Sequence, residues 1–148
     1  MQLNEQADPS SPGLQQVFKL HADACKALAN EHRLAILCAL SEGEMSVGDL
    51  AAEIGISVQN ASQHLRLMKE RCLVSARKEA QTVYYSVTNV KFLQGCALIR
   101  QALVEQHQAQ GECLLAAELL DAIQHMPQPA PELHPQQSAQ VGGPEDTS

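Results

Sequence analysis

The segment from Ser46 to Arg71 contains two short helix patterns separated by a tight turn, and it restricts the fold more than any other feature of the chain. Ser46 and Asp49 have the spacing of a capping box, in which a serine hydroxyl caps the start of a helix. Gly55 ends that helix, and Ser57 caps a second one that continues to about Arg71. Two short helices joined by a glycine-containing turn predict a helix-turn-helix motif.

Further helices and one β-hairpin surround this motif. The predicted helices cover residues 14–29, 31–42, 90–110 and 112–123, and the predicted strands cover residues 73–78 and 83–87. Only 3% of the residues are aromatic and Trp is absent, so the core must be built from aliphatic side chains, which favours packed helices. The predicted fold class is therefore mainly α with a β-hairpin wing, which is a winged helix-turn-helix.

The length and the composition predict one folded domain with polar ends. The 148 residues suffice for one domain, which we place at residues 14–125. Residues 1–13 are expected to form a flexible arm, and residues 126–148 a disordered, Pro/Gln-rich acidic tail. Neither a membrane-spanning segment nor a signal peptide is visible, so we expect a cytoplasmic protein without a membrane partner. Five scattered cysteines without a C-x-x-C pair predict free thiols.

The distribution of charge favours a nucleic-acid partner, although the formal net charge is −7. All ten Lys and Arg residues lie between residues 14 and 105, where there are nine acids. Five of the cations lie close together, with Glu70 as the one acid among them: Arg66, Lys69, Arg71, Arg77 and Lys78. Because local potential decides where phosphate docks, this segment can bind DNA despite the negative total. A solvated charged surface is the alternative.

The second helix of the motif has a polar face suited to reading DNA. We expect one stripe to face inward: Val58, Ala61, Leu65 and Met68. The opposite face is rich in Gln, Asn and Ser, and Gln and Asn can make paired hydrogen bonds to a base edge, typically of adenine. A solvent-exposed polar stripe without function would more commonly contain Glu and Lys. The candidate DNA-binding residues are Ser57, Gln59, Asn60, Ser62, Gln63, His64, Arg66, Lys69, Arg77 and Lys78.

Six short helices leave more apolar surface than one small domain can bury. The first helix and the last two have apolar stripes without an evident partner in the chain. A second copy is the simplest partner, so we predict a homodimer with two-fold symmetry. Its two recognition helices would then match a palindromic double-stranded DNA operator.

Four stretches of residues 17–105 resemble the ArsR/SmtB family of transcriptional repressors. They are KALANEHRLAIL at 26–37, SVGDLAAEIG at 46–55, the serine-capped stretch with SQHL at 57–65, and VYYSV at 83–87. The resemblance implies a winged-helix homodimer that represses an operon and releases DNA when an effector binds. The chain departs from the family at Cys72, where Gly is common. Cys72 must either extend the recognition helix or adopt a conformation that glycine adopts more easily.

Two effector sites that the family would imply are absent from the sequence. Ser46 and Gly48 stand where the arsenic-type site has two cysteines, and neither can bind a soft ion. Lys91 and Ala102 stand at ligand positions of the zinc-type site, and neither can bind zinc. We therefore expect no cofactor, with arsenite or a metal ion at a relocated cysteine site as an alternative. The candidate thiols for that site are Cys25, Cys38, Cys96 and Cys113.

A third branch of the family, which senses reactive sulfur species through two cysteines, agrees with part of the sequence. Cys38 stands at the first cysteine position, but Val104 occupies the second. Cys96 and Cys113 remain as candidate partners, and Cys96 lies on nearly the same helix face as Val104. The predicted function is therefore a DNA-binding repressor that a thiol-reactive effector releases, with effector residues Cys38, Cys96 and Cys113.

Other classes of function have weaker support. No Gly-rich phosphate loop, nucleophile elbow or H-E-x-x-H motif is present, so an enzyme is not expected. The remaining alternative is a protein-interaction module whose winged helix no longer binds DNA.

Overall fold

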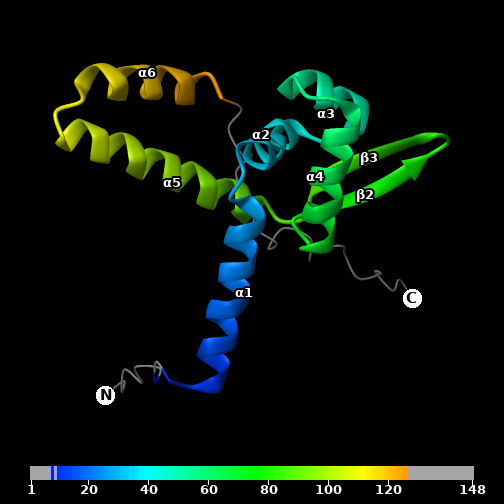
Figure 1. Cartoon of the computed structure of the whole chain (residues 1–148), viewed down its shortest axis with the longest axis horizontal. Helices are drawn as coiled ribbons and strands as arrows, with labels where there is room; N and C mark the ends of the chain where they lie inside the picture. Colours follow the sequence, from blue (N-terminus) through cyan, green and yellow to red (C-terminus); the bar gives the residue numbers. More distant parts are fainter. Residues whose placement is uncertain (1–7, 9, 127–148) are drawn as a thin grey trace, which may run out of the picture.

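A computed structural model describes residue 8 and residues 10–126, and it has the predicted winged-helix arrangement (Figure 1). The elements are α1 (Pro12–Leu28), α2 (Glu31–Ala39), the 3-10 turn η1 (Leu40–Glu42), β1 (Met45–Ser46), α3 (Val47–Ile54), α4 (Val58–Glu70), β2 (Val74–Glu79), β3 (Thr82–Val87), α5 (Val90–Ala109) and α6 (Cys113–Gln124). Almost all of the predicted tail, and most of the predicted N-terminal arm, lie outside the described residues. The predicted arm extends too far along the chain, because Ser11 caps α1 and Pro12 begins it.

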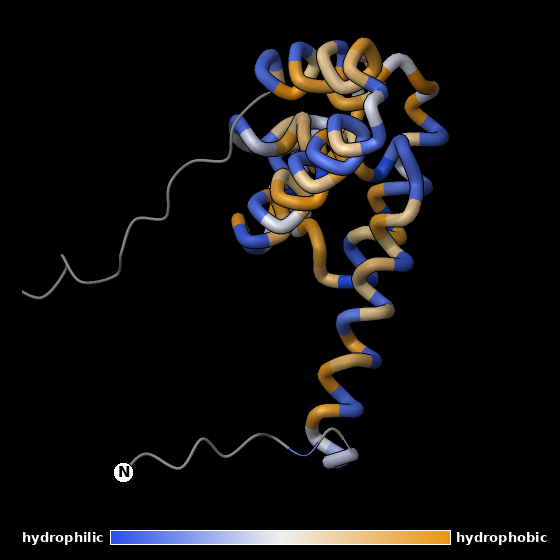
Figure 2. Tube along the Cα trace, turned by 90° about the vertical axis from the view of Figure 1, so that its left-hand side faces the viewer, coloured by the Kyte–Doolittle hydropathy of each residue, from blue (hydrophilic) through white to orange (hydrophobic). Residues whose placement is uncertain are grey.

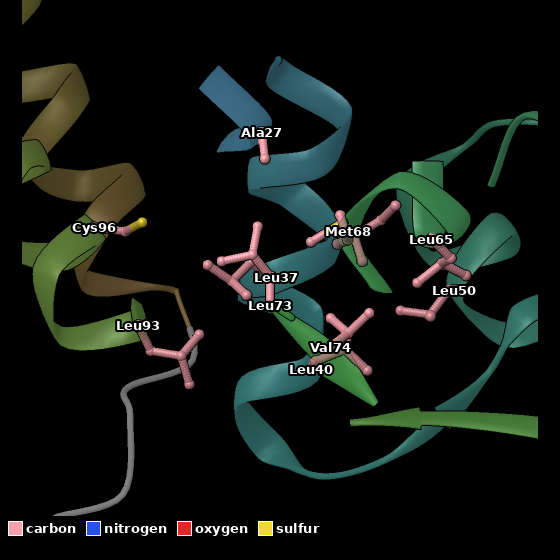
Figure 3. Close-up of a cluster of buried hydrophobic side chains, with 11 residues drawn as sticks. Ala27, Leu37, Leu40, Leu50, Leu65, Met68, Leu73, Val74, Leu93 and Cys96 are labelled. Carbon is pink, nitrogen blue, oxygen red and sulfur yellow. The ribbon is translucent and has the colours of Figure 1, made fainter. Parts of the chain in front are cut away.

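The core lies between α2, α3, α4, β2 and the start of α5 (Figure 3). Its largest fully buried side chains are Ile36, Leu37, Leu50, Leu65, Met68, Leu73 and Val74. Ala61, Leu65 and Met68 face inward as predicted, but the prediction for Val58 is wrong, because its side chain is 52% exposed. Val58 is the first residue of α4 and lies before the turn that reaches the core.

The wing is one hairpin of a three-stranded antiparallel sheet in the order β1-β3-β2. Strands β2 and β3 pair from Val74 with Val87 to Glu79 with Thr82, so only Ala80 and Gln81 form the turn. The short β1 is not predicted by the sequence. It consists of Met45 and Ser46, which pair with Tyr85 and Tyr84 and so join the start of α3 to the wing.

Helix α4 ends in a left-handed turn at Cys72, which has φ +58°. The Cys72 N–H donates to the Lys69 carbonyl at 3.0 Å and the Leu73 N–H to the Met68 carbonyl at 2.9 Å. These two bonds, with buried Leu73 and Met68 at the same end, form a Schellman motif, which normally places glycine at the left-handed residue. Cys72 therefore does not extend the helix. It adopts the left-handed conformation, which is strained for a residue other than glycine.

Helices α1, α5 and α6 carry apolar side chains that the rest of the fold does not cover. Helix α1 extends away from the body (Figures 1 and 2), and Ala27 is its one buried residue. Helix α6 folds back along α5, because Gly111 at φ +80° ends α5. The exposed large apolar residues on these helices are Val17, Phe18, Leu20, Leu98, Ile99, Leu103, Leu114, Leu115 and Leu120.

Cys72→Gly is expected to stabilise the fold. A side chain in the left-handed region costs about 1–3 kcal/mol, and glycine returns about 0.4–1 kcal/mol of this as extra entropy of the unfolded chain. We expect the free energy of unfolding in urea to rise by about 1 kcal/mol. Cys72→Ala removes the exposed sulfur but keeps Cβ, and it serves as the control with an expected change below about 0.5 kcal/mol. Equal stability of the glycine and alanine variants would contradict this account.

Candidate nucleic-acid interface and thiol pocket

Burial of one stripe fixes which face of α4 meets solvent. Ala61, Leu65 and Met68 are each fully buried, at positions one helical turn apart. The opposite face is therefore directed outward, and its exposed residues are Gln59, Asn60, Ser62, Gln63 and Arg66. Ser57 is also exposed, but its hydroxyl accepts a hydrogen bond from the Asn60 N–H at 3.1 Å. Ser57 thus serves as the N-cap of α4 in this structure.

The Arg and Lys side chains predicted to bind DNA differ in the ion pairs that they form within the protein. Arg66 forms an ion pair with Glu70 at 3.3 Å, but the two side chains are 83% and 59% exposed. Such an exposed pair within one helix contributes only about 0.3–0.5 kcal/mol, so a phosphate can displace Glu70. Lys69 and Lys78 are exposed on α4 and on the wing.

Arg77 lies midway along the wing and is held there by two carboxylates. Its guanidinium donates to Glu44 at 2.6 and 3.2 Å and to Glu79 at 2.8 Å. It also lies 4.9 Å from the centre of the Tyr84 ring. Hydrogen bonds from Arg77 hold the pKa of Glu44 below its usual value, and the two carboxylates raise the pKa of Arg77. No local sequence pattern indicates Glu44, because its partner Arg77 follows it by 33 positions.

His64 is a residue of α4, the recognition helix, and its ring lies beside the start of α2. Its ring centre is 5.6 Å from that of His32, and its Nδ1 is 3.5 Å from a guanidinium nitrogen of Arg33. Arg33 also donates to the Ala27 carbonyl, so the same cluster reaches the end of α1. Burial lowers the pKa of His64, and the charges of Arg33 and His32 lower it further. His64 is thus half-buried and contacts α2, whereas the other predicted DNA-binding residues of α4 are exposed.

Cys38 and Cys96 line one small pocket between α2 and α5. The other lining residues are Leu34, Leu37, Ser41, Leu93 and Arg100. Figure 3 shows the Cys96 sulfur directed from α5 toward the helices that carry Ala27 and Leu37. Cys113 is exposed at the start of α6 and does not line this pocket. Of the three thiols considered for the effector site, the structure brings two together.

Opposing influences act on these two thiols. Burial raises the pKa of the Cys38 thiol, Arg100 acts to lower it, and Glu42 acts to raise it. Burial also raises the pKa of Cys96, where Arg100 again acts to lower it and Cys25 acts to raise it. Arg100 is thus a positive charge that acts on both sulfurs.

The described residues offer no cluster suited to a metal ion. Within residue 8 and residues 10–126, no three His, Cys, Asp or Glu side chains are grouped as metal ligands would be. In the same part of the chain, no helix is both long and apolar enough to cross a membrane.

These features define a DNA-binding winged-helix domain, and comparisons with known proteins agree. A family model described as a helix-turn-helix domain matches residues 28–75. The transcriptional activator HlyU of Vibrio cholerae is 44% identical over 81 residues, which cover 53% of this chain and 75% of HlyU. A biofilm growth-associated repressor of Xylella fastidiosa is 37% identical over 73 residues, covering 49% of this chain but only 64% of the repressor.

Solved structures show that the fold of this chain is also similar to that of known proteins. A structure of reduced HlyU from Vibrio cholerae has a TM-score of 0.55 at 36% identity, covering 61% of this chain and 95% of that one. The homodimeric winged helix-turn-helix DNA-binding domain of Mb0332 from Mycobacterium bovis, a possible ArsR-family regulator, has a TM-score of 0.57 at 30% identity, covering 73% of this chain and 95% of that one. The chain belongs to the ArsR family of winged-helix transcriptional regulators.

His64 is expected to make stability depend on pH. Since its pKa is lower in the folded chain than in the unfolded chain, the unfolded chain binds the proton more readily. The stabilisation is complete above the ordinary histidine pKa of about 6.5 and is lost as pH falls toward the folded-state pKa. His64→Gln should flatten this part of the curve of unfolding free energy against pH. His21→Gln, on the exposed face of α1, is the control, and equal slopes in both variants would contradict the prediction.

Proposed function

We propose that the chain is a dimeric repressor that holds an operator through α4 and releases it when Cys38 and Cys96 are oxidised and linked. Two features of the same domain carry the proposal. Helix α4 has an outward polar face, and two thiols line one pocket between α2 and α5. Repression, rather than activation, is the direction that the resemblance to ArsR/SmtB repressors supports.

DNA recognition is assigned to the outward face of α4. Gln59, Asn60 and Gln63 have the side-chain amides that make paired hydrogen bonds to adenine in the major groove. Ser62, Arg66 and Lys69 lie on the exposed part of the same helix and would contact phosphates. Lys78 on the wing would reach the backbone beside the groove. Because Arg77 already binds Glu44 and Glu79, its role would be to hold the wing in place for these contacts.

A second copy is the partner proposed for the uncovered apolar faces. Helix α1 extends from the body with Val17, Phe18 and Leu20 exposed. A single helix of 17 residues with so little packing is marginal in water. Packing against the same faces of a second chain would bury these side chains. Two-fold symmetry would also place the two α4 helices for successive major grooves, about 34 Å apart.

The effector reaction uses a hydropolysulfide as the oxidant. A thiolate of the pocket attacks a sulfane sulfur, the S–S bond of the reagent breaks, and hydrosulfide leaves. The second thiolate attacks the new persulfide at the protein-bound sulfur, which joins Cys38 to Cys96 and expels a second hydrosulfide. With HSS⁻ as reagent, two thiols give up two protons and two electrons, and the products are one protein disulfide, H₂S and HS⁻.

Helix α2 offers the route from the thiols to DNA. It carries Cys38, and it packs against both α3 and α4 through Ile36 and Leu37 in the core. Linking α2 to α5 would favour a different position of α2. Since packed cores switch between discrete arrangements, the recognition helices of the dimer would change position with it. One solved structure of the similar protein HlyU is of its reduced form, and this favours a redox-dependent function for this chain.

Removing two phosphate-binding cations should weaken DNA binding without unfolding the protein. We expect Arg66→Ala with Lys69→Ala to bind less tightly to a duplex that the wild-type chain selects from a random-sequence pool. Each lost contact should reduce the slope of log affinity against log salt by about 0.9. The dimer loses four contacts, so the slope should fall by about 3 to 4. Fluorescence anisotropy at several salt concentrations measures both quantities.

Lys26→Ala with Lys91→Ala is the matched control, because it removes the same charge from exposed positions and leaves α4 and the exposed apolar residues of α1 intact. An unchanged salt slope in the α4 variant would rule out this face of α4 as the DNA surface. Equal losses in both variants would instead indicate a general charge effect.

Cys38→Ser should abolish release of DNA by polysulfide. The wild-type dimer is expected to lose at least about tenfold in affinity for the selected duplex after polysulfide treatment, and to regain it with a reducing agent. The variant should bind DNA as before and show no loss. Cys72→Ser is the control, since Cys72 is exposed and lies outside the pocket, and it should respond like the wild type.

Mass spectrometry of the treated protein identifies which cysteines join. A link between Cys38 and Cys96 is the expected product. A link from Cys38 to Cys113, or a full response in Cys38→Ser, would contradict the proposed pair. A protein that releases DNA with arsenite or a metal ion instead would support the alternative effector.

A further inference from the structure

The pocket between α2 and α5 contains two hydrogen-bond donors in addition to its two thiols. Cys96 and Arg100 are four residues apart on α5, so they lie one turn apart on one face. Cys38 and Ser41 are three residues apart across the end of α2, and they face the same pocket from the other side. Each wall therefore supplies one sulfur and one polar side chain, while Leu34, Leu37 and Leu93 close the space.

The two donors lack acceptors within the described part of the chain. Arg100 Nε and Ser41 Oγ are the buried side-chain polar atoms there that have no hydrogen-bond partner. A buried donor without an acceptor destabilises the fold, and a charged donor does so more strongly, so such atoms require an explanation. The sulfurs of Cys38 and Cys96, which line the same pocket, are candidate acceptors. A neutral thiol is a weak acceptor, whereas a thiolate accepts strongly.

We propose that Arg100, assisted by Ser41, is a positioning residue that stabilises the anionic form of the reacting sulfur in this pocket and so increases its reactivity. The proposal rests on the proposed function, because it explains how thiols in an apolar pocket can react at neutral pH. Only the thiolate is nucleophilic, and burial among leucine side chains disfavours it. The Arg100 guanidinium, one turn from Cys96, offsets part of that penalty.

The charges around the pocket agree with this role. Arg100 acts to lower the pKa of both Cys38 and Cys96. Glu42 from η1 acts against it at Cys38, and Cys25 from α1 acts against it at Cys96. The arginine also restricts the class of effector. An uncharged apolar ligand would leave Nε unpartnered, whereas a sulfur anion, either the protein thiolate or the persulfide formed from it, would pair with it.

The test is the pH dependence of thiol alkylation in the full-length protein. Iodoacetamide rates at Cys38 and Cys96, resolved by mass spectrometry, give the midpoint at which each thiolate forms. Arg100→Met keeps an unbranched apolar side chain of similar stem but removes the guanidinium and its charge. We expect its midpoints to rise by about one pH unit or more, and alkylation near pH 7 to be at least about tenfold slower. Arg100→Lys should restore part of the rate.

Controls separate this role from a packing role. Lys91→Met removes a cation from the first turn of the same helix and should leave the midpoints unchanged. If Arg100 served only to fill space, Arg100→Met would expose the thiols and speed alkylation at every pH without moving the midpoint, and that result would overturn the proposal. If Arg100→Met does not fold, Arg100→Gln, which also removes the charge, and Ser41→Ala provide the test. Unchanged midpoints in both of those variants would also overturn it.

Alkylation requires neither polysulfide nor DNA, so it fails independently of the proposed function. If wild-type Cys38 and Cys96 do not link with polysulfide, yet Arg100→Met shifts their midpoints, the sensing function is wrong and the role of Arg100 stands. If the thiols link and release DNA, yet the midpoints do not move, the sensing function stands and the role of Arg100 is wrong.

Discussion

Burial of a single stripe on α4 is the constraint on which the rest of this structure depends. Ala61, Leu65 and Met68 are completely removed from solvent, and this fixes the rotation of the helix about its axis. The polar residues between them then have only one direction in which to point. The same burial continues through Leu73 and Val74 into the wing, so the recognition helix and the hairpin share one core. Their relative position is thereby set by packing rather than by the polar residues that would contact DNA.

Helix α2 links the two functional regions. Its inner side packs on α3 and α4, its first turn contributes the His32 and Arg33 contacts to His64, and its last turn carries Cys38. A change at the thiols therefore acts on an element that already touches the recognition helix. The thiol pocket itself is mostly apolar, which penalises charge on its sulfurs. Arg100 is the group placed to oppose that penalty, so the reactivity of the pocket depends on a balance between burial and one cation.

Most of the fold could be predicted from the sequence, because its signals are local. Ser46 and Ser57 cap the helices that their spacing indicated, and Gly55 ends α3 in a left-handed conformation. Exceptions occur where long-range contacts decide. The short β1 exists only because Met45 and Ser46 pair with β3, which no local pattern indicates. Val58 fits a helical apolar stripe but is exposed, since the core does not extend to the first residue of α4.

The sequence by itself determined the elements, the polar face of α4 and the presence of five thiols, because caps, apolar spacing and residue type act over a few positions. Only the tertiary structure decided which distant side chains meet. It brought the free thiols of Cys38 and Cys96 to one pocket and left Cys113 exposed, and it placed Arg100 and Ser41 in the same pocket. It also paired Arg77 with Glu44. The physical reason is that burial of apolar surface across the whole core sets how α5 approaches α2 and how the wing approaches α3. Apolar burial is not directional, so the apolar pattern of the sequence does not indicate which polar side chains will meet.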